Sequence, residues 1–232
     1  FQYIYGSRGR IVEKKVPSAD WVHIVYNKLD QPVLTQDGNQ RLNDEWSFIK
    51  YDALARPIIT GIYWNSNTRN ILQTQADGWY SVPYEVADNS ADSHPNNVHY
   101  QGMGYSDYSF PKIIQDVSYA NPQNEPENSP LLYHGIINSI TYYDDYDIDR
   151  NGIDDIALVS MASLGMNLEP SFMHGNNVRF KGKVTGIKVR VLNPESGHAK
   201  WLRTFTFYDK YGREIQTISE NHVLRSNGLP NI

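Results

Sequence analysis

One turn motif recurs four times along the chain, and this recurrence constrains the fold more than any other feature of the sequence. A tyrosine ends a short β-prone stretch, and an arginine or glutamine follows it five residues later. The four pairs are Tyr5 and Arg10, Tyr26 and Gln31, Tyr51 and Arg56, and Tyr208 and Arg213. A reacting site occurs once, whereas a structural unit recurs. The recurrence therefore favours a structural turn over an active site.

Each copy has the residue pattern of a β-hairpin. In the last copy an alternating stretch, 205–208, leads into a four-residue turn that begins with Asp209 and ends with Gly212, and a second β-prone stretch follows at 214–218. Asp can bond to the backbone of its own turn, and Gly takes positive φ without strain. We therefore expect a hairpin at each copy, with the tyrosine ring and the arginine guanidinium stacked or paired across its strands.

The third copy departs from this pattern at one position. Ala55 stands where Gly212 stands in the last copy, and a Cβ atom disfavours positive φ. We therefore predict that the backbone of the turn at Ala55 differs from that of the turn at Gly212.

The composition supports a β-rich fold. Of the 232 residues, 40% are hydrophobic and 12% are aromatic, with 17 tyrosines. This chain is too apolar for disorder, and its Tyr, Thr, Val and Ile residues favour pleated sheets. No segment keeps the apolar spacing of a helix over three turns. We expect an all-β or strongly β-rich fold with at most one or two short helices.

Charge and hydropathy argue against several classes of protein. The net charge is −5 and no basic stripe is present, so nucleic acid is not an expected partner. No run of about 18 apolar residues is present, so we expect no membrane span in this chain. The absence of cysteine excludes disulfides and thiolate chemistry. The first ten residues already resemble the middle of a strand–turn unit, so we expect a piece of a longer protein.

The turn motif also resembles a known family. The segment Tyr208-Asp209-Lys210-Tyr211-Gly212-Arg213 is similar to the Tyr-Asp-x-x-Gly-Arg pattern of the YD repeat in rearrangement-hotspot (RHS) proteins. Asp52 and Arg56 fit the same pattern, and the flanking phrases look like large RHS-type surface proteins of Bacteroidetes. The resemblance implies an extracellular or cell-surface protein whose neighbouring repeats build a scaffold or shell. In RHS proteins such a shell can enclose a C-terminal toxin or effector domain.

A segment of different character separates the third and fourth copies. It contains polar stretches that indicate long loops, and strand-like runs between them. The predicted organisation is repeat hairpins at 1–63, a β-rich insert with long polar loops at 64–200, and a final hairpin at 201–232 that packs on the rest.

The insert holds one candidate calcium site in its Asp-rich stretch. Counted from Asp147, oxygen-bearing side chains fall at positions one, three, five and nine, Gly152 falls at six, and a backbone carbonyl would serve at seven. A bound Ca²⁺ would be structural. The alternative is a solvated acidic turn, because Leu158 stands where an EF-hand loop has its bidentate Glu. The candidate ligands are Asp147, Asp149, Asn151, Ile153 and Asp155.

Other chemistry has weaker support. His94 and His99 have no third ligand at a zinc spacing, and no Gly-x-Ser-x-Gly elbow is present. We therefore expect no catalytic residue and no enzyme activity. Two alternatives stay open. One is a hydrolase whose site assembles only in space.

The other alternative is a carbohydrate-binding module. Aromatic residues crowd the first half of the insert, and sugars stack on exposed rings. Clustered rings more often form a core, which is the interpretation that we favour. The candidate ligand-binding residues are Trp64, Trp79, Tyr80 and Tyr105.

Overall fold

A computed structural model describes most of the repeat segments and part of the insert. The described residues are 1–79, 83–85, 109–111, 113, 135–147, 181–192, 201–209 and 211–221, with the backbone alone of two short strands at 99–100 and 105–106. The chain divides into two compact units, 1–101 with 105–138, and 102–104 with 139–232.

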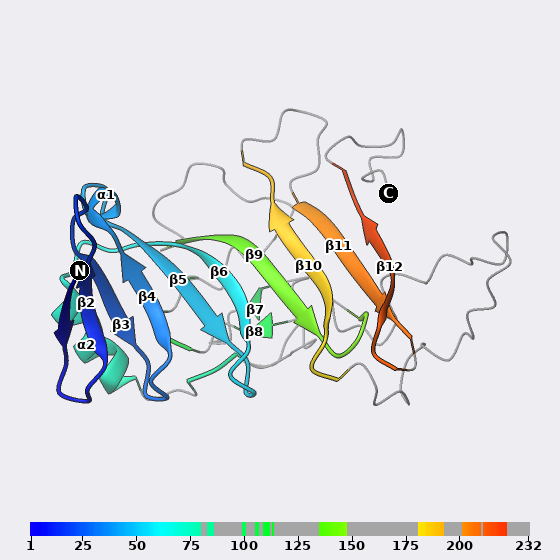
Figure 1. Cartoon of the computed structure of the whole chain (residues 1–232), viewed down its shortest axis with the longest axis horizontal. Coiled ribbons are helices and arrows are strands. Elements are labelled where there is room, and N and C mark those ends of the chain that lie inside the picture. The colour runs from blue at the N-terminus through cyan, green and yellow to red at the C-terminus, as the bar shows by residue number, and fades with distance from the viewer. Residues whose placement is uncertain are drawn as a thin grey trace, which may run out of the picture. The chain divides into compact units, whose positions relative to one another are not determined.

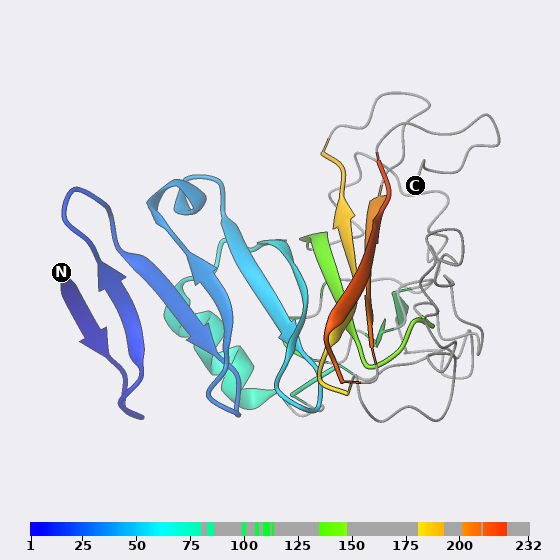
Figure 2. The same ribbon diagram turned by 45° about the vertical axis from the view of Figure 1, so that its right-hand side comes forward.

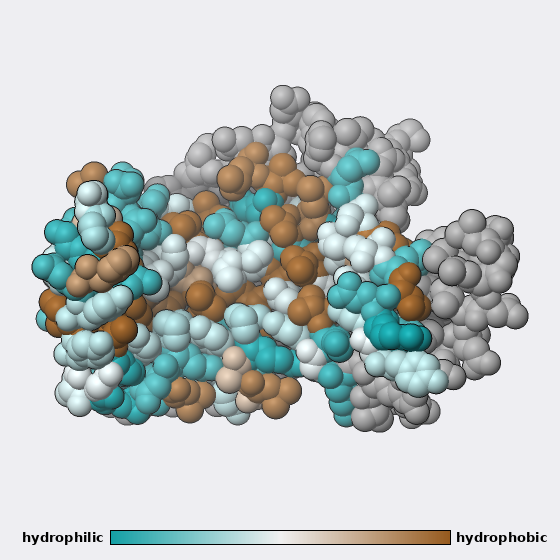
Figure 3. Space-filling view, in the orientation of Figure 1, coloured by the Kyte–Doolittle hydropathy of each residue, from teal (hydrophilic) through white to brown (hydrophobic). Residues whose placement is uncertain are grey.

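The fold is β-rich, as the composition predicts. Ten strands form an antiparallel sheet in the order β1-β2-β3-β4-β5-β6-β9-β10-β11-β12, and the described residues include two helices (Figure 1). None of the described helices is long and apolar enough to cross a membrane. Apolar and polar residues are interspersed on the face of the sheet in Figure 3.

The first unit is built on three consecutive hairpins. Their strands are β1 (Gln2–Tyr5), β2 (Ile11–Lys15), β3 (Val22–Tyr26), β4 (Pro32–Gln36), β5 (Glu45–Tyr51) and β6 (Pro57–Trp64), with β7 (His99–Tyr100) and β8 (Tyr105–Ser106) as a separate pair. Trp46, Phe48 and Ile59 are buried in its core. The short helix α1 (Gly38–Arg41) connects β4 to β5 and begins with a capping box.

The helix α2 (Arg69–Gly78) packs on one face of the first unit, against β3 (Figure 2). Its buried residues include Leu72 and Ala76. Gln73 accepts a hydrogen bond from the backbone N–H of Tyr26 at 3.0 Å and donates one to the carbonyl of Tyr26 at 2.9 Å. The helix is therefore fixed to the strand by both apolar packing and a two-point amide contact.

The strand β9 (Gly135–Tyr143) begins in the first unit at a close approach of two backbones. A Cβ atom at Gly61 would lie 2.0 Å from the carbonyl oxygen of Ile136, and one at Gly135 would lie 2.4 Å from that of Ile62. Neither position has room for a side chain. Glycine is therefore required on both sides where β6 meets the first residues of β9.

The second unit contains two hairpins. It takes β9 from Ser139 onward, with β10 (Val184–Arg190), β11 (Trp201–Tyr208) and β12 (Glu214–Ser219). Tyr146 stacks on Phe207 with ring centroids 4.7 Å apart, and its hydroxyl donates to the carbonyl of Thr206 at 3.0 Å. Ile140 and Phe205 are buried in the same core.

Candidate functional site: the repeat turns and their junctions

The four motif copies form turns with one backbone conformation. The residue four places after each tyrosine has positive φ in every copy. Two backbone hydrogen bonds of 2.8 to 3.1 Å close each turn, and the strand register shifts at each tyrosine. This geometry is a type I turn followed by a G1 bulge. The positive-φ residues are Gly9 (72°), Asp30 (62°), Ala55 (64°) and Gly212 (75°).

The prediction that the turn at Ala55 would differ is therefore wrong, and the side chain of Asp52 gives the reason. One oxygen of Asp52 accepts the backbone N–H groups of Leu54 and Arg56 at 2.9 Å, and the other accepts Nε of Arg56 at 2.6 Å. Asp209 makes the same three bonds in the last turn. These bonds and the strand pairing impose one backbone, so Ala55 bears the strain that Gly avoids.

The second copy keeps the same network without charge. Asn27 accepts from the backbone N–H groups of Leu29 and Gln31 at 3.0 Å, and its side-chain amide donates to the side-chain oxygen of Gln31 at 2.7 Å. Asn and Gln thus replace Asp and Arg as a pair. The two departures from the motif that appear separate in the sequence compensate each other in the structure.

The first copy uses a residue of its neighbour instead. Gly6 has no side chain at the Asp position, and a Cβ there would lie 2.9 Å from Val12. Nη1 of Arg10 lies 2.7 Å from the carboxylate of Asp30, the positive-φ residue of the second copy. The motif arginine therefore links two turns here.

Each motif tyrosine from the second copy on contacts the preceding hairpin. The hydroxyl donates to the carbonyl of the first residue of that hairpin's second strand, which stands seventh in the motif. The bonds run from Tyr26 to Ile11 at 2.7 Å, from Tyr51 to Pro32 at 2.9 Å, and from Tyr208 to Val184 at 2.7 Å. Burial raises the pKa of all three tyrosines, which keeps the hydroxyl protonated as a donor.

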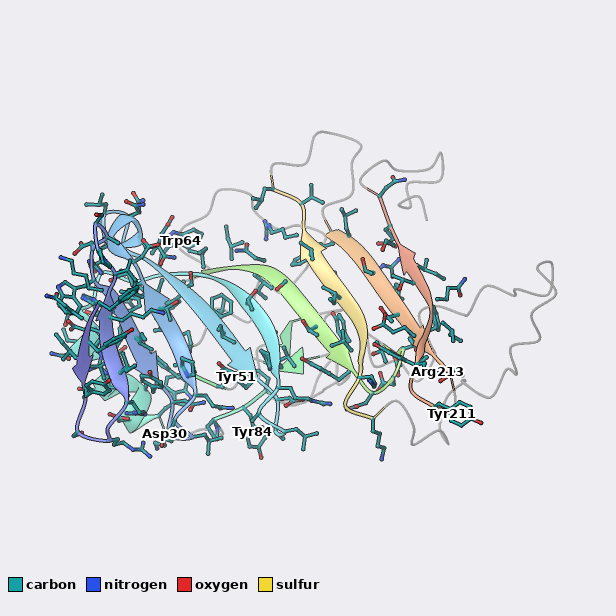
Figure 4. The ribbon with its side chains drawn as sticks, viewed as in Figure 1. Asp30, Tyr51, Trp64, Tyr84, Tyr211 and Arg213 are labelled. Atoms are coloured by element: carbon teal, nitrogen blue, oxygen red, sulfur yellow. The ribbon has the colours of Figure 1, made fainter. Side chains whose placement is uncertain are left out.

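In two hairpins the cation at the sixth motif position lies over the tyrosine of the next hairpin, where we expected stacking of the motif tyrosine and arginine within one turn. The guanidinium of Arg10 lies 4.6 Å from the ring centre of Tyr26, and Nζ of Lys183 lies 5.7 Å from that of Tyr208. Tyr51 lies at the turn end of β5 and Trp64 at the opposite end of β6 (Figure 4). The junctions at Tyr26 and Tyr208 thus combine a ring, a cation and a hydrogen bond between adjacent hairpins, whereas the junction at Tyr51 has Gln31 at the sixth position and keeps the hydrogen bond.

The structure contains a fifth hairpin of the same kind, which the sequence search missed. Tyr143 pairs with Val184 as Tyr51 pairs with Pro57 in the third copy. The strand register then shifts at the next pair, Tyr142 with Gly186, as it does in the other copies. The N–H of Asp144 donates to the carbonyl of Lys183 at 3.3 Å, and Gly182 has a positive φ of 84°. Motif positions one, two, five, six and seven are therefore occupied by Tyr143, Asp144, Gly182, Lys183 and Val184.

The two middle residues of this fifth turn are replaced by residues 145–181. Asp144 departs from the other copies because its own φ is 77°, and its side chain accepts the N–H of Gly182. The signal in the sequence is a Tyr-Asp pair and a Gly-Lys pair. A search that requires the two pairs to lie within six residues cannot connect them.

The calcium candidate falls mostly outside the described residues. Asp147 is described and buried, with 7% of its surface exposed. Asp149, Asn151, Ile153 and Asp155 lie outside the described part of the chain. Within that part, no three His, Asp or Glu residues are grouped so that they could hold a metal ion. The calcium site therefore stays a prediction.

The aromatic candidates are described only in part. Trp64 is 37% exposed at the end of β6, whereas Trp79 follows α2 and packs edge-on against Phe110 at 5.6 Å. Tyr80 lies outside the described residues, and of Tyr105 only the backbone is described. His94 also lies outside them. Carbohydrate binding therefore stays a prediction.

One buried cluster combines a serine, a lysine and a glutamate in the first unit. Nζ of Lys50 lies 2.7 Å from Oε1 of Glu85 and donates to the carbonyl of Ser109 at 3.0 Å. The N–H and hydroxyl of Ser109 both donate to the same carboxylate oxygen, at 3.0 and 2.6 Å. Both charged side chains are 0% exposed, so the cluster has no surface at which a substrate could meet it.

This cluster instead anchors parts of the insert to the sheet. The N–H of Glu85 donates to the carbonyl of Tyr51 at 2.8 Å, so the segment 83–85 is fixed beside the third motif turn. Lys50 of β5 then joins this segment to Ser109. Each charge has a close partner, as burial of a charge requires.

Comparison with known proteins gives no further assignment: no family model and no curated protein matches the chain.

Proposed function

We propose that this chain is a structural, non-catalytic segment of a cell-surface or secreted RHS/YD-repeat protein, in which such hairpins build a scaffold or shell. The observation that carries the proposal is the repeated junction, in which a motif tyrosine donates to the preceding hairpin at Ile11, Pro32 and Val184. A device that recurs between successive units is the means by which repeat proteins extend.

The chemistry of the turn supports a structural role. Asp52 is saturated by the N–H groups of its own turn and by Arg56. In the second copy the same geometry is made by Asn27 and Gln31, which carry no charge and no acid or base function. A reacting site would depend on the charged pair, whereas a turn depends only on the hydrogen bonds.

Under this proposal the partners of the chain are the neighbouring repeats of a longer polypeptide. The cargo of a completed shell would be an effector domain. These two expectations come from the family resemblance, and the regular junctions are compatible with them.

The experiment uses an antibody raised against this chain on intact cells of the source organism. The expected result is a band far larger than 26.6 kDa that disappears when the cells are treated with an external protease. A cytoplasmic protein serves as the control for lysis. A band at the mass of the chain alone, or one that the protease leaves intact, would overturn the proposal.

We also propose that the Asp-rich stretch binds Ca²⁺ in a structural role. The spacing of Asp149 and Asp155 within it supports this proposal. Millimolar Ca²⁺ should raise the unfolding temperature relative to EGTA, and the double variant Asp149→Asn/Asp155→Asn should lose the increase. An unfolding temperature that is equal in Ca²⁺ and EGTA would refute calcium binding.

A further inference from the structure

We propose that one segment of the insert acts as a strap that fixes the second hairpin to the third, at the junction where Gln31 stands in place of a cation. The strap is defined as residues 69–79 together with 83–85. It lies within the first unit, where α2 packs against β3. This role goes beyond the proposed scaffold function and does not require surface localisation.

Adjacent hairpins of the first unit share only short ladders. Within a hairpin the strand pairing continues to the motif tyrosine, as between Tyr26 and Pro32. Between hairpins it consists of two residue pairs, and these lie away from the motif turns. A ladder this short fixes the angle between two hairpins poorly, so contacts at the turn ends set it. The pairs are Glu13 with His23 and Lys14 with Val22, and Leu34 with Phe48 and Thr35 with Ser47.

Charge links the turn ends of the first and second hairpins. The guanidinium of Arg10 lies 4.6 Å from the ring centre of Tyr26. Arg8 and Arg10 also form ion pairs with Asp30 of the second turn, at 3.0 and 2.7 Å. At the next junction the sixth motif residue is Gln31, so the contacts that Arg10 makes through its charge are not available to it.

The strap is bonded to the second hairpin at two places. The side chain of Gln73 in α2 makes two hydrogen bonds with the backbone of Tyr26, at 3.0 and 2.9 Å. Nζ of Lys28, in the second turn, donates to the carbonyl of Trp79 at 2.6 Å. Both the motif tyrosine and its turn are therefore tied to the same segment.

The strap then reaches the third hairpin. The side-chain amide of Asn27 donates to the carbonyl of Pro83 at 3.4 Å, and the N–H of Glu85 donates to the carbonyl of Tyr51 at 2.8 Å. The carboxylate of Glu85 also pairs with Lys50 of β5 at 2.7 Å. The strap is thus bonded on both sides of the gap between the second and third turns, where the ladder has already ended.

Hydrogen exchange of the 232-residue chain tests the strap. Gln73→Leu removes both bonds to Tyr26 and keeps a similar side-chain volume. The amides of the β4–β5 ladder should then exchange about tenfold faster, whereas those of the β2–β3 ladder, whose hairpins Arg10 also links, should change less. Lys28→Met, at an exposed position, should accelerate the same β4–β5 amides by a smaller factor. Gln75→Leu, at an exposed position of the same helix, is the matched control and should leave both ladders unchanged.

Restoring a cation to this junction gives the decisive measurement. Gln31→Lys places an ammonium group at the motif position from which Arg10 and Lys183 lie over the next tyrosine. In the Gln73→Leu background it should return the exchange of the β4–β5 ladder most of the way to the wild-type rate. In the wild-type background it should change this rate little, because the strap already holds the junction.

Three results would overturn the strap. They are β4–β5 amides that exchange alike in Gln73→Leu and the wild type, a loss of protection that is equal in the two ladders, and a Gln31→Lys substitution that protects equally in both backgrounds. The second result would mean that α2 stabilises the whole unit, and the third that strap and cation act independently. Circular dichroism establishes that each variant is folded. The scaffold proposal would survive all three, because protease treatment of intact cells tests it separately.

Discussion

At Ala55 a methyl group occupies a backbone conformation that residues with a Cβ atom rarely adopt. The φ of 64° matches that of the other three turns, two of which have glycine there. The bonds that Asp52 makes across the turn hold this conformation. Ala55 is exposed, so its side chain gains little from packing that would offset the strain.

Ala55→Gly should therefore stabilise the chain. Relief of the left-handed strain is expected to raise the free energy of unfolding by about 1 kcal/mol, less the entropy that glycine adds to the unfolded chain. Urea denaturation measures the change. Ala53→Gly, in the same exposed turn but without positive φ, is the control and should not stabilise. A loss of stability in Ala55→Gly would show that the turn imposes no strain.

The hydroxyl groups of the motif tyrosines define a second prediction at this scale. Tyr51→Phe leaves the carbonyl of Pro32 without the hydroxyl that donates to it at 2.9 Å. The expected loss in the free energy of unfolding is about 1 kcal/mol. Tyr5→Phe, at the exposed tyrosine of the first copy, should change the stability little. Equal effects of the two substitutions would mean that the hydroxyl bond adds nothing to the junction.

At the scale of elements, the fifth hairpin behaves as a repeat with an inserted segment. Its strands keep the register of the motif although residues 145–181 separate the two halves of the turn. The other hairpins have two residues at this place in the turn, so the strand pairing does not require the inserted segment.

Replacing residues 145–181 with Lys-Tyr, the pair at 210–211 of the last turn, should therefore keep the pairing of β9 with β10. Loss of the Tyr146 ring from its stack on Phe207 should lower the free energy of unfolding by about 3–5 kcal/mol. Far-UV circular dichroism and cooperative thermal unfolding are the measurements, and β9 and β10 should keep their protection from hydrogen exchange. The shortened chain should also lose any response to Ca²⁺. A chain in which β9 and β10 lose this protection would show that the strand pairing depends on the replaced segment.

The buried pair of Lys50 and Glu85 has a different role, since it fixes the insert to β5. Lys50→Met should lower the free energy of unfolding by about 3–5 kcal/mol, because it leaves a buried carboxylate without its cation. The double variant Lys50→Met/Glu85→Gln should recover part of this loss. Chemical denaturation of the two variants gives the comparison. A double variant that is less stable than Lys50→Met would argue against the ion pair as the cause.

At the scale of the whole molecule, the junction tyrosines predict how stability depends on pH. Burial raises the pKa of Tyr26, Tyr51 and Tyr208 above the ordinary value of 10.0. Because the folded chain holds these protons more tightly than the unfolded chain, their contribution is complete below about pH 10. It is lost as the pH rises through the raised pKa values.

Urea denaturation at several pH values between about 8 and 11 should therefore show a fall in stability at the alkaline end. The triple variant Tyr26→Phe/Tyr51→Phe/Tyr208→Phe should be less stable at neutral pH and should fall less steeply. Its absorbance titration should lack three of the tyrosines whose pKa burial raises. If the wild type and the triple variant showed the same alkaline slope, the junction tyrosines would not be its source.

Much of the fold was predictable because each turn is made by bonds among six consecutive residues. The recurrence of tyrosine and arginine therefore predicted four hairpins, and the composition predicted a β-rich fold. The conformation at Ala55 was predicted wrongly. The prediction used the tendency of alanine to avoid positive φ, and the hydrogen bonds of the turn and the strand pairing outweigh that tendency. The calcium stretch and the aromatic candidates remain predictions from spacing alone.

The sequence by itself determined where the turns lie and which residues close them, because those interactions are local. Only the tertiary structure decided which hairpin each tyrosine contacts, because that depends on which strands meet. It alone joined Tyr143 and Asp144 to Gly182 and Lys183, since strand pairing brings together residues that the inserted segment separates in the sequence.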